Sequence, residues 1–385
     1  MQFLKLIVRN ALRHKLRTGL TVVGIVVAIL AFGLLQTIVD AWYAGAEGAA
    51  PNRLVTRNAV SLVFPMPLHY RDKIRAVEGV RRVAPFNWFG GYYQEPKNFF
   101  AQFAIDPLPF LAMYPEYLIP DDELRAFLRD RKGAVIGRKL AQRYGFKIGD
   151  TIPLQGTIYP GTWTFTVRAI YDGADAKVDA SQLLFHWDYL NETLKQRSPR
   201  RGDQVGVFMV QIDDPHRSAE IGQAIDRLFK NSLAETLTET EKAFQLGFVA
   251  MTQTIVVAIR IVSFVVIFII LAVMANTMAM TARERLGEYA TLKAVGFGPG
   301  YVAGLIFGES VAIAAAGAAL GIALTFPVAA WFAVQMGKFF PVFGVSAETV
   351  ALQAGCALVV GLVAAVLPGR RAARVKIVEG LRAIG

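Results

Sequence analysis

Four long stretches of the chain are almost free of charged residues: residues 18–39, 261–280, 301–333 and 349–367. Each is close to the ~20 residues that an α-helix needs to cross ~30 Å of hydrocarbon, because a helix rises about 1.5 Å per residue. A wholly soluble protein is therefore excluded. The sequence predicts an α-helical membrane protein with four transmembrane helices.

The basic residues cluster beside these stretches. The formal net charge of the 385-residue chain is +11, and it divides into +4 over residues 1–40, +2 over 41–250 and +5 over 251–385. Lys and Arg next to membrane spans are typical of cytoplasmic segments. The charge pattern therefore predicts a multi-pass protein that contacts membrane lipid and has both termini in the cytoplasm, and it gives no reason to expect a nucleic-acid partner.

Spans and charges together divide the chain. We predict, in order, a cytoplasmic amphipathic helix at 1–17, a first span at 18–40, an extracytoplasmic domain at 41–245, a second span with an outward stalk at 246–281, a cytoplasmic coupling helix at 282–300, a third span at 301–333, an outer loop at 334–348, a fourth span at 349–368 and a cytoplasmic tail at 369–385. The basic residues of 1–17 have an alternative role, in which they only set the topology.

The segment between the first two spans alternates strand and helix patterns. Residues 53–58 and 80–89 are typical of strands, 121–128 of a capped helix, and about 146–186 of a β-rich subdomain. An α+β domain is predicted. The single cysteine, Cys356, lies in the fourth span, so this domain holds no disulfide and depends on its own core.

The second span has helical character well beyond the membrane. Between Thr238 and Thr281 there is no proline and one glycine, Gly247. A continuous helix there would transmit motion between the cytoplasmic side and the exported domain. The alternative is two helices with a break near Gly247.

The third span carries pairs of glycines and one acid. Glycines four residues apart permit close approach of helices in lipid, so we expect a packing or dimer face there. Glu309 is the one charge in this span, and we expect it to pair with Arg283 or Arg285. The glycines are Gly304, Gly308, Gly317 and Gly321.

The loop between the second and third spans carries the strongest signal. Residues 283–297 predict a short helix that ends at Gly296. Leu286, Tyr289 and Ala290 share one face with Lys293, and we expect this ridge to be a docking surface for a soluble partner. The candidate coupling residues are Arg283, Glu284, Arg285, Glu288, Tyr289, Leu292, Lys293, Gly296 and Phe297.

Motifs for catalysis are missing from the sequence. It contains no phosphate-binding loop, no nucleophile elbow and no His-Glu-x-x-His pair, and its four histidines show no metal spacing. We therefore expect no catalytic residues, no metal site and no cofactor on this chain. A membrane-anchored enzyme that acts through residues 41–245 is the least favoured class.

Three segments resemble the permease subunits of the ABC transporter class typified by macrolide exporters, lipoprotein-releasing complexes and FtsX-like permeases. They are the segment 9–25, the loop, and the tail. The matching residues of the loop and the tail are Arg285, Glu288, Lys293, Ala294 and Gly296, followed by Pro368, Ala372, Ala373, Glu379, Leu381 and Arg382.

The resemblance implies a permease in a bacterial cytoplasmic (inner) membrane, working as a homodimer or with a similar chain. It implies a separate cytoplasmic ABC ATP-binding subunit that holds ATP and Mg²⁺, and allows a periplasmic adaptor protein. Two functions follow as hypotheses: export of a hydrophobic or amphiphilic substrate, such as a drug, peptide, lipid or lipoprotein, or mechanotransmission that activates an extracytoplasmic partner without transport.

Overall fold

The computed structural model describes residues 13–175, 177–336, 340 and 342–375. It divides into two compact units. The bundle unit comprises residues up to Ala41, Thr252–Met336 and the chain from Phe343 onward, and the head unit comprises Trp42–Met251 with Gly337–Val342. The predicted amphipathic helix at 1–17 lies outside the described residues for most of its length, as does the tail beyond Val375.

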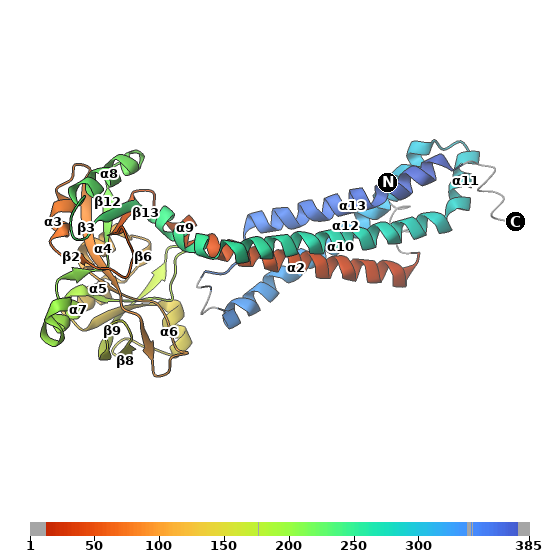
Figure 1. Ribbon diagram of the computed structural model, residues 1–385. Helices are drawn as coiled ribbons and strands as arrows, with labels where there is room; N and C mark the ends of the chain where they lie inside the picture. Colours follow the sequence, from red (N-terminus) through yellow and green to blue (C-terminus); the bar gives the residue numbers. More distant parts are fainter. Residues whose placement is uncertain (1–12, 176, 337–339, 341, 376–385) are drawn as a thin grey trace. The chain divides into compact units, whose positions relative to one another are not determined.

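The bundle unit is built from long apolar helices. Four of the described helices are long and apolar enough to cross a membrane, which confirms the predicted fold class. They run alongside one another in Figure 1, and the short helix α11, which follows α10 in the chain, lies at one end of them. Their bounds are α2 Lys15–Gly48, α10 Gln253–Glu284, α11 Leu286–Ala294, α12 Pro299–Met336 and α13 Ala347–Arg374.

Small residues set the close packing of this unit. A Cβ atom added at Gly317 of α12 would lie 2.6 Å from Ile25 Cγ2 of α2, and one added at Gly321 would lie 3.0 Å from Ile29. Close backbone approach of this kind is a main source of helix association in lipid. Gly317 and Gly321 therefore pack against α2 of the same chain.

Buried polar side chains also connect these helices. Gln353 of α13 is fully buried and donates to the carbonyl of Ile29, 2.8 Å away, and to the hydroxyl of Thr325, 2.9 Å away. At the N-terminus of α13, Asp40 accepts hydrogen bonds from the hydroxyls of Ser346 and Thr349. Because an unmade buried hydrogen bond is costly, these contacts fix α2, α12 and α13 against one another.

The head unit is a mixed sheet covered by helices (Figure 1). The strand order is β13-β1-β12-β3-β5-β10-β7-β9-β8-β4, with β6 paired to β9 and a separate pair of β2 and β11. The strands are β1 Arg53–Asn58, β2 Met66–Pro67, β3 Val80–Trp88, β4 Gly91–Tyr93, β5 Gln102–Ile105, β6 Tyr117–Leu118, β7 Gly133–Gly137, β8 Thr151–Gly156, β9 Gly161–Gly173, β10 Leu183–His186, β11 Gln204–Val205, β12 Val207–Ile212 and β13 Thr236–Thr240.

Most neighbours in this sheet are antiparallel, and two pairs are parallel, β5 with β10 and β7 with β9. The β-rich segment predicted at about 146–186 supplies β8, β9 and β10 to the same sheet. The helices of the head are α3 Tyr70–Arg75, α4 Pro107–Met113, α5 Asp121–Arg129, α6 Arg138–Tyr144, α7 Trp187–Arg197, α8 Ser218–Leu228 and α9 Glu241–Met251.

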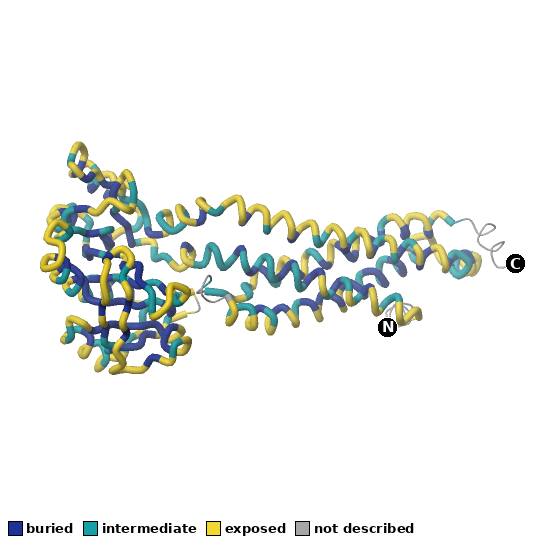
Figure 2. Tube along the Cα trace, turned by 60° about the horizontal axis from the view of Figure 1, so that its bottom comes forward, coloured by how far each residue is buried: buried dark blue, intermediate teal, exposed yellow. Residues whose placement is uncertain are grey.

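Aromatic side chains form much of the core of the head. Phe89 packs edge-to-face against Trp163, Phe165 and Phe185, with ring centroids 5.5 to 5.8 Å apart. All four rings are nearly inaccessible to solvent. Burial of each ring contributes about 1.5–3 kcal/mol, which explains how the head is stabilised without a disulfide. Figure 2 shows buried residues running through the strands of the head.

The predicted continuous helix through the second span is wrong in two places. Residues Thr238, Glu239 and Thr240 belong to strand β13, so helix begins only at Glu241. The helix is then interrupted at Thr252, whose φ of −108° and ψ of 10° are not α-helical. The break also lies five residues beyond Gly247, the predicted alternative. Where the chain enters the head, α2 continues to Gly48, past the predicted end of the first span at residue 40.

Candidate functional site

The short helix α11 lies between two membrane spans and ends in a tight backbone turn. Gly296 has a φ of +104°, which favours glycine. Its amide donates to the carbonyl of Lys293 and that of Phe297 to the carbonyl of Leu292, both at 3.0 Å. This pair of bonds is the Schellman arrangement, so the glycine predicted to stop the helix does so.

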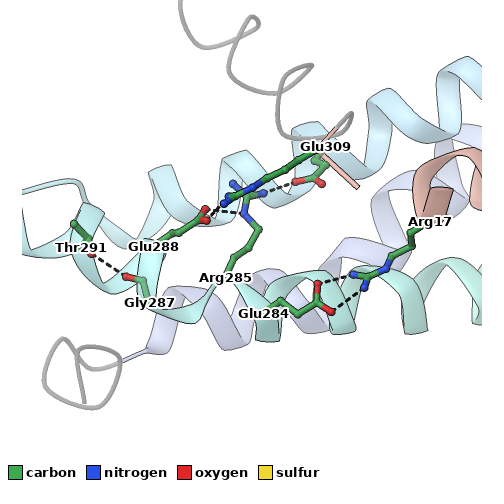
Figure 3. A network of polar contacts seen from close by, with 8 residues as sticks. Arg17, Glu284, Arg285, Gly287, Glu288, Thr291 and Glu309 are labelled. Atoms are coloured by element: carbon green, nitrogen blue, oxygen red, sulfur yellow. Dashed lines mark hydrogen bonds and ion pairs between the residues drawn. The ribbon is translucent and has the colours of Figure 1, made fainter. Parts of the chain in front are cut away.

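Arg285 forms the centre of a polar network beside α11 (Figure 3). Its guanidinium lies 3.0 Å from Glu309 of α12 and 3.0 Å from Glu288 of α11, and also faces the ring of Tyr289. Arg285 and Glu309 are both buried. The predicted pairing of the acid in the third span with a loop arginine is therefore confirmed for Arg285.

Two arginines at the start of α2 extend this network. Arg17 makes a two-pronged contact with Glu284, at 2.6 and 2.8 Å, and Arg13 pairs with Glu288. Figure 3 shows the carboxylate of Glu284 facing Arg17 across the gap between their helices. The basic residues ahead of the first span thus bind α11 and the end of α10.

Lys293 connects the other end of α11 to α13. Its ammonium donates to the carbonyls of Ala373 and Val375, at 2.6 and 2.9 Å. A cation at these carbonyls matches the negative end of the α13 dipole. As a result, the segment from Arg285 to Lys293 makes polar contacts with Arg13 just ahead of α2, with Glu309 of α12 and with the end of α13.

Charge and burial shift the pKa values of this site. Burial opposes the charge on Glu288, but hydrogen bonds from Arg285 and Arg13 outweigh it and lower the pKa of the carboxyl. Burial also opposes the charge on Arg285, but its interactions with Tyr289, Glu288 and Glu309 outweigh burial and raise its pKa. Burial raises the pKa of Tyr289 to about 12. Both ions are therefore charged, and Tyr289 is neutral, at neutral pH.

The central residues of the predicted docking ridge are buried inside the bundle unit. Tyr289 and Ala290 are 1% and 0% exposed and pack into the core of the bundle unit, so they are not available to a soluble partner. The exposed apolar side chains lie at the end of the helix instead: Val295 is 73% exposed and Phe297 is 41% exposed. Hydrophobic spacing identified the face that packs, but not what it packs against.

The structure brings most of the candidate coupling residues together. Arg283 and Gly296 are exposed, and Leu292 and Lys293 are half-buried beside them. Phe297 stacks on Tyr301, with centroids 4.6 Å apart. The glycines of the third span divide into two pairs: Gly304 and Gly308 are half-buried, whereas Gly317 and Gly321 are buried against α2.

Sequence reasoning missed several polar contacts. Arg13 and Arg17 were assigned only to topology or to an interfacial helix, and Gln353 was not singled out. The one available signal was an amide in an otherwise apolar span. Among the described residues there is no group of three or more His, Cys, Asp or Glu side chains placed to hold a metal ion.

Two family models match the chain. The one described as MacB-like periplasmic core domain matches residues 18–228, and the one described as FtsX-like permease C-terminal matches residues 260–377. These matches and the four spans define the class: a multi-pass membrane permease subunit of an ABC transporter. Because the first match covers more than half of the chain, the chain belongs to the family of permeases with a MacB-like periplasmic core domain.

Solved structures match about half of this chain at low sequence identity. The extracellular domain of the noncanonic ABC-type transporter YknZ from Gram-positive bacteria is 13% identical over 49% of this chain and 99% of its own, with a TM-score of 0.36. The periplasmic region of MacB from Actinobacillus actinomycetemcomitans is 10% identical over 52% and 94%, with a TM-score of 0.37. No curated protein matches the chain.

The family match identifies the kind of partner that its members work with. Its permeases have no catalytic domain and work with cytoplasmic ABC ATPase partners. In this chain α11 lies between two of the candidate spans, among basic residues that flank them.

Proposed function

We propose that this chain is the permease subunit of an ATP-driven exporter, with both termini in the cytoplasm. It works as a homodimer, or with a similar chain, on a separate cytoplasmic ATPase that supplies the ATP and Mg²⁺ chemistry. Its substrate is hydrophobic or amphiphilic, such as a drug, peptide, lipid or lipoprotein, and a periplasmic adaptor protein is a further partner.

The observation that carries this proposal is the way α11 is held. Val295 and Phe297, just after α11, are exposed and apolar, while Arg285 just before α11 binds α12 and Lys293 binds α13. An ATPase that docks on the apolar end and moves on ATP binding would displace α11. Since the ion pairs resist separation, α2, α12 and α13 would follow.

Helix α10 connects α11 to the head along the backbone. One residue, Arg285, separates α10 from α11, and one residue, Thr252, separates it from α9, which belongs to the head. Movement of α10 therefore reaches the head through the backbone. For ATP to drive export, the substrate must bind the two end states of this movement with different affinities.

Docking is tested by substitutions at the exposed end. Val295→Asp and Phe297→Asp place a charge in the contact, and we expect each to weaken capture of the ATPase about 30-fold, the size of a 2 kcal/mol hot spot. The matched control is Val63→Asp, since Val63 is 84% exposed on the head. Equal capture of all three variants in a pull-down from membranes would refute the docking role.

Transmission is tested separately, because Glu288 and Lys293 face the bundle. Glu288→Lys and Lys293→Glu should leave the ATPase bound while ATP hydrolysis no longer supports transport. Proteoliposomes loaded with a rhodamine dye or a dansyl-labelled phospholipid give the measurement. ATP-driven extrusion supports an exporter, whereas ATP-dependent activation of an extracytoplasmic partner without extrusion supports mechanotransmission.

A further inference from the structure

Arg53 occupies an unusual position for a charged residue. It is the first residue of β1, its side chain is 2% exposed, and it lies five residues after the last residue of α2. Charged side chains are almost never buried to this extent unless they are paired. The arginine is therefore expected to have specific partners.

One of its partners belongs to the chain segment that leads from the head to the second span, and two belong to the end of α4 and the residues after it. Arg53 Nε donates to Glu241, at 2.5 Å, and Glu241 is the first residue of α9. Arg53 Nη1 donates to Glu116, at 2.6 Å, and to the carbonyl of Met113, at 3.1 Å. One guanidinium thus binds the start of α9 and the segment that follows α4.

Tyr114 closes the arrangement. The guanidinium lies 4.0 Å from the centre of its ring, and its hydroxyl donates to the second oxygen of Glu241, at 2.9 Å. A planar guanidinium presents separate nitrogens to two carboxylates in a fixed fork while its face stacks on a ring, and the single nitrogen of an ammonium cannot reproduce that geometry. Both oxygens of the Glu241 carboxylate are occupied.

This cluster links two chain segments, here called tethers, through which the chain enters and leaves the head. The chain enters the head from α2, just ahead of Arg53, and leaves it through α9, beginning at Glu241. The two tethers also meet further along, where a Cβ added at Gly45 of α2 would lie 2.4 Å from the side chain of Gln245 of α9. Because buried ion pairs favour one fixed geometry more than they add stability, the cluster is suited to hold a joint rigid.

We propose that Arg53, with Tyr114, Glu116 and Glu241, is the joint through which α9 moves the head. The inference rests on the proposed function, since it assigns the point where displacement of the second span enters the exported domain. Arg53 is a positioning residue: it keeps α9 and β1 in one orientation. Without the two carboxylate contacts of this guanidinium, the rest of the head no longer moves together with α9.

The test compares two arginines of the same strand. Arg53→Lys keeps the charge but replaces the rigid fork by one nitrogen on a flexible stem, so the two carboxylates lose their fixed geometry. Arg57→Lys is the matched control, because Arg57 makes one ion pair, with Glu239 of β13 at 3.0 Å, and none with α9. Both variants are made in the full chain with Cys356→Ser, reconstituted with the partner ATPase, and spin-labelled at Ala250→Cys on α9 and Gln223→Cys on α8.

Pulsed electron resonance then reports the distribution of distances between the labels. We expect a narrow distribution in the parent and in Arg57→Lys, and a broad one in Arg53→Lys, together with a loss of about tenfold or more in dye extruded per ATP, the value of one charge-assisted hydrogen bond. The proposal is overturned if the parent and both lysine variants all give narrow distance distributions, or if both lysine variants broaden equally.

The two proposals fail in different ways. A parent complex that hydrolyses ATP but neither extrudes dye nor activates a partner refutes the proposed function, while the distance distributions still decide the joint. A variant with normal distances and lost extrusion refutes the joint alone.

Discussion

The packing of Gly317 on α2 yields a prediction that separates contacts within the chain from contacts between copies. A Cβ atom at this position would lie 2.6 Å from Ile25 Cγ2 and 2.7 Å from Ile25 Cβ, well short of ordinary contact. Ile25 is 1% exposed and β-branched, so rotation of its side chain cannot relieve the clash. We therefore expect α2 to be displaced in Gly317→Ala.

Overpacking of this kind costs about 1–3 kcal/mol. The higher helix propensity of alanine stabilises the helix by up to about 1 kcal/mol relative to glycine and so offsets part of this cost. With the full gain counted, the net expectation is a loss of up to about 2 kcal/mol. The matched control is Gly355→Ala in α13, where an added Cβ meets nothing within 4 Å, so only the gain remains.

Thermal unfolding in detergent measures the difference, and size-exclusion with light scattering measures assembly. Gly317→Ala should unfold at a lower temperature than the parent, Gly355→Ala at the same or a higher one, and neither should change the mass of the assembly. If Gly317→Ala is as stable as Gly355→Ala but dissociates, the glycine faces a second copy and the argument from α2 is wrong.

Three further outcomes follow from the structure. Glu309→Leu leaves Arg285 buried beside one remaining carboxylate, and we expect a loss of about 3 kcal/mol in stability, measured by thermal unfolding. Burial lowers the pKa of His186, so the unfolded head binds the extra proton first; stability of the head should be complete above pH ~6.5 and fall as the pH drops below it, and His186→Gln should flatten that slope in an unfolding titration. Gly33→Ala would place a Cβ 2.0 Å from the amide nitrogen of Gln353; expulsion of that amide should speed hydrogen exchange in α13, while an unchanged exchange pattern would contradict the packing.

Much of the fold could be predicted from composition and spacing. The four spans were evident because the cost of charge in lipid removes charged residues from whole stretches. The partner of Glu309 was also predictable, since an acid near the end of a span needs a nearby cation, and the loop supplies one in Arg285.

Other features depend on contacts that no local pattern encodes. The ridge of α11 was assigned to a soluble partner because amphipathic spacing is the same whether a helix packs on a bundle or on another protein. The Arg53–Glu241 pair spans 188 residues of sequence, and no short-range signal connects them. The interruption at Thr252 has no proline or glycine to mark it, so sequence favoured an unbroken helix.

The two ends of the described chain meet at the same helix. Arg13 pairs with Glu288 at one side of α11, and Val375 accepts a hydrogen bond from Lys293 at the other. A substitution at Arg13, or one that shifts the backbone carbonyl of Val375, would therefore act directly on α11, although each residue lies 82 or more positions from its partner in the sequence.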